Sequence, residues 1–191
     1  MGFAKKIAKH KTDKMTGACK KVQQLKAKTS QHVQISYLEQ NLRDTALYME
    51  TVEVLANVFT ACARFKFKFG TPRVEMLMEK VNSQMDCIKQ GYITSADIRR
   101  ILHDELKMNL DYKPQGEMTH NRQITSRAIQ DITAAFMISL ADGWGYKKLR
   151  LSRYHTMAAK MVHSLHTNQL SVSQVCMMAA GKMKFTLGVK K

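Results

Sequence analysis

The chain contains Ile93-Thr94-Ser95-Ala96-Asp97-Ile98 and, further along, the similar stretch Leu170-Ser171-Val172-Ser173-Gln174-Val175. We call the separation between the first residues of the two stretches, 170 − 93 = 77, the repeat offset. Each stretch places an apolar residue before a hydroxyl side chain that can cap a helix, Thr94 or Ser95 in the first and Ser171 in the second. The repeat offset continues downstream, where 106–110 match 183–187, and upstream, across a small gap, Phe69 matches Trp144. We interpret these matches as an internal repeat, with chance similarity between amphipathic helices as the alternative.

Each copy reads as a helix, a glycine-containing turn, a second helix, a short loop and a third helix. The first helices are expected over 52–66 and 127–141, Gly70 and Gly145 suit the turns, and Pro72 suits the first turn of a helix. We therefore predict an all-α protein: a basic N-terminal arm or helix followed by two related three-helix units. The expected boundaries are 1–28 for the arm, 29–111 for the first unit, 112–122 for a linker and 123–191 for the second, basic unit.

Positive charge is concentrated at both ends of the 191-residue chain. Lysine and arginine number 31 against 15 acidic residues, a formal net charge of +16. Residues 1–28 carry 9 − 1 = +8, residues 29–111 carry 10 − 11 = −1, and residues 112–191 carry 12 − 3 = +9. This distribution favours a polyanionic partner, nucleic acid or a nucleic-acid-bound protein. Charge that only aids solubility, an acidic protein surface and a membrane surface are the alternatives, and we expect no membrane partner.

Two stretches carry the candidate contacts. The first is the N-terminal segment, where phosphate contacts are expected from seven lysines: Lys5, Lys6, Lys9, Lys11, Lys14, Lys20 and Lys21. The second is 142–154, which combines glycines with a cluster of cations at the start of a helix: Lys147, Lys148, Arg150 and Arg153. Trp144 and Tyr146 are possible base-stacking residues. For Trp144 a place in the core is the favoured alternative.

Other chemistry is not indicated. The chain has none of the glycine-rich, serine or metal-binding motifs of common enzyme families, so we expect no enzyme, no cofactor and no metal. The stretch 86–97 resembles a calcium loop but lacks the early oxygen ligands. A helix-turn-helix in which 95–107 presents Arg99, Arg100 and His103 is an alternative, weakened by acids on the same helix. The four separated cysteines and the absence of a long apolar run predict a cytoplasmic protein with reduced thiols.

Three short stretches, GWGYKKLRL at 143–151, FGTPRVEML at 69–77 and GYITSADI at 91–98, resemble the helix-turn signals of small accessory proteins from bacteriophages and mobile elements of Gram-positive bacteria. The resemblance covers about residues 52–188 and matches no single named family. It implies a non-enzymatic role in the bacterial host cell, through binding of DNA or RNA. The alternative it implies is inhibition of a host defence nuclease, as some inhibitors of the CRISPR nuclease Cas9 share this size and lack of catalytic motifs.

Overall fold

The computed structural model describes the backbone of residues 3–110 and 117–183, and side chains from residue 34 onward within those ranges. In this part of the chain every regular element is a helix, six in all, which confirms the all-α prediction. Part of the predicted linker 112–122 lies outside the described residues. Within them, 117–119 are not helical, whereas 120–122 form the start of the helix that begins at His120. Residues 1–45 and 46–191 form two separate units, and the second contains the packed core.

The longest element is α1, Phe3–Phe67. Its sequence contains no proline and one glycine, and lysine, alanine and glutamine make up much of its first half. Because these residues lose little side-chain freedom in a helix, the helix runs uninterrupted through this stretch. Residues 3–28, the predicted basic arm or helix, belong to α1.

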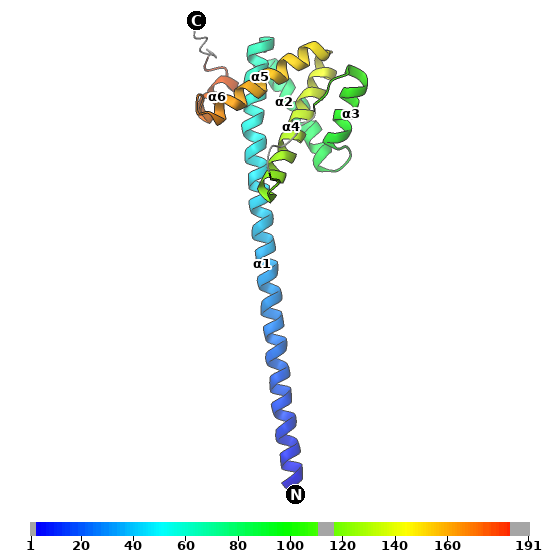
Figure 1. Cartoon of the computed structure of the whole chain (residues 1–191), viewed down its shortest axis with the longest axis vertical. Coiled ribbons are helices and arrows are strands. Elements are labelled where there is room, and N and C mark those ends of the chain that lie inside the picture. The colour runs from blue at the N-terminus through cyan, green and yellow to red at the C-terminus, as the bar shows by residue number, and fades with distance from the viewer. Residues whose placement is uncertain (1–2, 111–116, 184–191) are drawn as a thin grey trace. The chain divides into compact units, whose positions relative to one another are not determined.

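The other five helices follow in the order α2 (Thr71–Lys89), α3 (Ser95–Leu106), α4 (His120–Trp144), α5 (Lys148–His166) and α6 (Val172–Ala179) (Figure 1). Pro72 lies in the first turn of α2, as predicted from its fixed φ. Thr94 and Ser171 are the N-caps of α3 and α6, each within a reciprocal capping box, so the capping prediction is confirmed at both positions.

Helix bounds recur at the repeat offset. The helices α1 and α4 end at Phe67 and Trp144, and α2 and α5 are both 19 residues long, starting at 71 and 148. Lys68 and Gly145, which both have a left-handed backbone conformation with positive φ, are also separated by the repeat offset. The register therefore has no gap, and the sequence-based match of Phe69 with Trp144 was two residues out of step. Phe69 corresponds to Tyr146, because each donates its backbone N–H six residues back, to Ala63 and Leu140.

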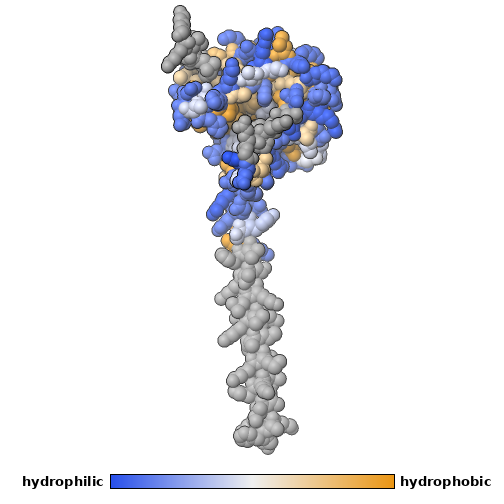
Figure 2. All heavy atoms as spheres, in the orientation of Figure 1, coloured by the Kyte–Doolittle hydropathy of each residue, from blue (hydrophilic) through white to orange (hydrophobic). Residues whose placement is uncertain are grey.

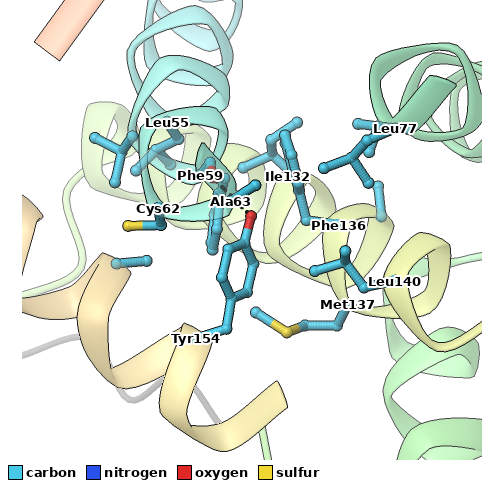
Figure 3. Packing of buried hydrophobic residues seen from close by; sticks show 14 of the residues in the cluster. Leu55, Phe59, Cys62, Ala63, Leu77, Ile132, Phe136, Met137, Leu140 and Tyr154 are labelled. Atoms are coloured by element: carbon cyan, nitrogen blue, oxygen red, sulfur yellow. Dashed lines mark hydrogen bonds between the residues drawn. The ribbon is translucent and has the colours of Figure 1, made fainter. Parts of the chain in front are cut away.

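The core is built from contacts between helices that are distant in the sequence. Helix α4 packs on α2 and α3. The end of α1 contacts α5 and α6, since Tyr154 donates a 2.7 Å hydrogen bond to the Phe59 carbonyl and Arg64 donates to the Ala179 carbonyl (Figures 1 and 3). At the centre, Phe59 and Phe136, which are separated by the repeat offset, stack with ring centroids 4.9 Å apart. One core cluster thus contains residues from all six helices.

Candidate nucleic-acid interface

Two equivalent turns join the long helices to α2 and α5. We call residues 66–73 and 143–150 the basic turns. Each changes direction at a left-handed residue, Lys68 with φ 55° in the first and Gly145 with φ 61° in the second. Glycine adopts this conformation without strain, whereas lysine has a Cβ that makes it unfavourable. The first turn therefore keeps a cation at a position where backbone geometry alone would select glycine.

Aromatic side chains hold the basic turns side by side. The ring of Phe67 lies 4.5 Å from that of Tyr146, and the ring of Phe69 lies 5.1 Å from that of Trp144, measured between centroids. These two contacts are reciprocal, because at the repeat offset Phe67 corresponds to Trp144 and Phe69 to Tyr146. Tyr146 and Phe69 are buried, and Trp144 is half-buried. The cluster fixes the relative position of the two turns, which bring together residues far apart in the sequence.

The basic turns contain six exposed cations and no acidic residue. They are Lys66, Lys68 and Arg73 in the first turn and Lys147, Lys148 and Arg150 in the second. None of these six forms an ion pair within the part of the chain that the structure describes. Arg153 lies exposed one turn further along α5. Like charges held close together repel one another, and an anion lying across both turns would remove that repulsion.

Three of the cations lie over aromatic rings, Lys68 with its Nζ 5.7 Å from the centroid of Phe65 and two arginines. The guanidinium carbon of Arg150 is 5.1 Å from the centroid of Tyr146, and that of Arg73 is 6.0 Å from the centroid of Phe69. The two arginine pairs are again equivalent, since each residue of one pair corresponds to its counterpart at the repeat offset. A guanidinium held in this way loses less freedom when it binds phosphate, and its planar fork matches phosphate oxygens in pairs.

Backbone groups add to the positive potential at the basic turns. Both α2 and α5 begin there without a side-chain cap, and neither has an acidic residue in its first turn. The first N–H groups of a helix have no partner within the helix, and the helix dipole gives this end a partial positive charge. Figure 2 shows one face of the molecule, where hydrophilic side chains predominate around the packed helices and hydrophobic ones lie in separate patches.

The residues predicted from sequence fall in three places. Lys147, Lys148, Arg150 and Arg153 are exposed on the second turn and α5. The seven N-terminal lysines belong to α1, and their side chains lie outside the described part of the structure. Tyr146 is only 9% exposed, with Phe67 and Arg150 against its ring, so stacking on a base would require these neighbours to move. Trp144 packs against Phe69, the arrangement favoured as its alternative role.

Sequence reasoning missed Lys66, Lys68 and Arg73. The charge count over 29–111 averaged to −1 and concealed a local excess between residues 64 and 73, where four cations occur without an acid. A window as short as a single turn would have shown it. The correct register would also have shown it, because Arg73 lies at the position equivalent to Arg150.

The alternative helix-turn-helix surface on α3 is partly neutralised. Arg100 pairs with Asp97 at 3.0 Å and His103 with Asp104 at 3.1 Å, while Arg99 donates back to the Ser95 carbonyl. These three side chains are therefore less available to phosphate than the cations of the basic turns. Among the described residues, no three His, Cys, Asp or Glu side chains are placed to hold a metal ion.

Comparisons of the chain with protein-family models, with curated proteins and with solved structures found no match. Among the described residues, no helix combines the length and apolar character needed to cross a membrane.

Proposed function

We propose that this protein binds nucleic acid without catalysing a reaction, with the basic turns as its main phosphate-binding surface. The observation that carries the proposal is the juxtaposition of two equivalent turns that present six cations and no acid. Phosphates along a nucleic-acid backbone are spaced closely enough for several of them to contact such a surface at once. Arg153 and the N-terminal lysines extend the proposed contact.

We also propose that the chain consists of two related three-helix units, α1–α3 and α4–α6, whose first helices are exchanged. The helix bounds at the repeat offset and the reciprocal aromatic contacts support this relationship. A contact between equivalent residues, such as Phe59 with Phe136, is what an approximate two-fold axis produces. Such an axis would give the two basic turns similar access to one nucleic acid.

The basic turns are a better candidate than α3 because their charge is uncompensated. Affinity that depends on phosphate contact falls as salt rises, since bound cations displace the counterions of the nucleic acid. The expected signature is therefore a steep linear dependence of log affinity on log salt, with little preference for sequence. The aromatic rings of the basic turns are engaged with one another, which favours contacts with phosphates over contacts with bases.

The test is fluorescence anisotropy with labelled duplex DNA, single-stranded DNA and RNA over a salt series. One variant replaces Lys66, Lys68 and Arg73 by glutamine, and a second replaces Lys147, Lys148 and Arg150. Each should reduce the salt slope by about 2–3, the value for losing up to three phosphate contacts on duplex DNA. A matched control replaces three exposed lysines elsewhere, Lys89, Lys107 and Lys160, for the same loss of charge.

Equal effects of the control and the two variants would show that only net charge matters and would contradict the assignment to the basic turns. No binding by the full chain near about 150 mM salt would contradict nucleic-acid binding as a whole. The sequence-based alternative, inhibition of a defence nuclease, would then be tested by pull-down with such a nuclease.

A further inference from the structure

The segment 34–49 of α1 exposes a row of large apolar side chains. Ile35, Leu38, Leu42 and Met49 are 54%, 60%, 71% and 58% exposed. Exposed apolar residues scattered singly are normal, but these four recur on one helix at intervals of three, four and seven residues. They therefore form one face of α1, which we call the α1 seam.

The spacing of the α1 seam is that of a heptad repeat. Ile35, Leu42 and Met49 are seven residues apart and occupy the a positions, and Leu38 and Thr45 occupy the d positions. Heptad spacing is the sequence pattern of helices that pack along one another, because it keeps the same face toward the partner. Thr45 is compatible with burial in such an interface, since its hydroxyl already donates a 2.8 Å hydrogen bond to the Asn41 carbonyl.

The residues beside and behind the α1 seam suit pairing with an identical helix. Between parallel copies, the flanking g and e positions would pair Gln34 with Glu39 and Asn41 with Ala46, so no like charges meet. On the outer face, Gln40 donates a 2.7 Å hydrogen bond to Asp44 four residues on, which keeps polar groups on that side. Helices gain most of their stability from burying an apolar face, and a second copy offers a face that matches this one.

The orientation follows from the neighbouring residues. In a parallel pair, each seam residue meets its own counterpart, and all five layers come from the a and d positions between Ile35 and Met49. An antiparallel pair that keeps the seam together sets Ile35 against Val52, but Val52 is half-buried against the core of its own chain. The parallel arrangement is therefore the one that leaves the core undisturbed.

We infer that two copies of this chain associate through a parallel two-stranded coiled coil along the α1 seam. This pairing also predicts an unusual response to salt. Residues 1–28 carry +8 in each copy, and a parallel pair brings two such segments together. Because salt screens the resulting repulsion, the dimer should tighten as ionic strength rises, opposite to the expected effect on nucleic-acid binding. The inference does not depend on nucleic acid.

Sedimentation velocity of the full chain, without nucleic acid, tests the pairing. The expected mass rises with concentration from one chain, 21.8 kDa, toward two. Leu38→Gln with Leu42→Gln should abolish the dimer. Tyr37→Gln is the matched control, because Tyr37 is an apolar residue of the same helix, 67% exposed, that lies outside the α1 seam. It should leave the dimer unchanged.

A gain-of-association variant guards against misfolding as the cause of a negative result. Thr45→Leu adds an apolar d position and should lower the dissociation constant about tenfold, a change of about 1.4 kcal/mol. A chain that stays at the mass of one copy at every concentration and salt would overturn the inference. So would equal association of the Leu38/Leu42 variant, or a Thr45→Leu variant no tighter than the natural chain.

Cysteine cross-linking distinguishes the two orientations. In a parallel pair, Leu38→Cys should form a disulfide with its own counterpart on oxidation, and Met49→Cys should do the same, above the background of the natural chain. If covalent dimers formed only in a mixture of the two variants, the pair would be antiparallel and the inferred arrangement would be wrong.

Discussion

Replacing Tyr154 by phenylalanine removes one hydroxyl from the centre of the fold. Tyr154 is fully buried and donates a 2.7 Å hydrogen bond to the Phe59 carbonyl, which joins α5 to α1 (Figure 3). The carbonyl lies within α1 and keeps its helical hydrogen bond, so no acceptor is left without a partner. The expected loss is therefore the net value of one hydrogen bond, about 1 kcal/mol in the free energy of unfolding.

Tyr154→Leu should cost more, although the equivalent position in the first set of helices is Leu77. The Tyr154 ring lies 5.6 Å from Phe59 and 5.3 Å from Phe67, and leucine would lose both ring contacts and leave a void. We expect a total loss of about 3 kcal/mol. Urea unfolding followed by circular dichroism measures both values, with an unchanged m-value as the check that the unfolded state is the same.

The same hydroxyl should make the protein sensitive to alkali. Burial raises the pKa of Tyr154 well above its ordinary value of 10.0. Because the folded state holds this proton more tightly than the unfolded state, the associated stability is present below about pH 10 and is lost as pH rises toward the folded pKa. Tyr154→Phe should remove this part of the alkaline loss, up to about 1.4 kcal/mol per pH unit. Equal stability of Tyr154→Phe and the natural chain at neutral pH, or the same alkaline loss in both, would refute the reasoning.

Three further predictions concern single positions. Ser139→Ala should stabilise the protein by about 1 kcal/mol in thermal or urea unfolding, because the Ser139 hydroxyl is buried without a hydrogen-bond partner among the described residues. A loss of stability would contradict this. Burial raises the pKa of Cys62 to about 12, so Cys62 should react with a thiol reagent at about pH 8 only after unfolding. Half-buried Cys87 should react in the folded protein, and mass spectrometry follows both reactions. Gly145→Ala should lower the unfolding free energy by about 1 kcal/mol through backbone strain alone, since no neighbouring atom lies within 4 Å of the added Cβ. A neutral result would show that the turn relaxes.

Local signals in the sequence were sufficient for the helix starts but not for the packing. Thr94, Ser171 and Pro72 act within a single turn of helix, so their roles follow from short-range rules. The register of the repeat was misplaced by two residues because glycines and aromatic residues were aligned by type. The structure shows that the shared feature of each turn is a left-handed residue, which is lysine at 68 and glycine at 145.

The candidate site was only half predictable for a similar reason. The second turn has three cations within four residues, Lys147, Lys148 and Arg150. The first has Lys66 and Lys68 separated by Phe67 within a segment of balanced charge. Their joint contribution depends on Phe67 packing against Tyr146. Three helices, α2, α3 and α4, separate these two residues in the sequence. Periodicity along one helix carries no information on such a distant pairing.

The long-range contacts at the end of α1 have a consequence for the order in which this chain acquires its structure. The Tyr154–Phe59 and Arg64–Ala179 contacts join positions 95 and 115 residues apart. During synthesis, the apolar end of α1 must therefore wait for α5 and α6 to leave the ribosome before it can be covered. Such distant pairing slows folding because much chain entropy is lost before contacts form. Truncation ahead of α5 should thus yield a chain with an uncovered apolar helix, prone to aggregate or to recruit a chaperone, rather than a smaller folded domain.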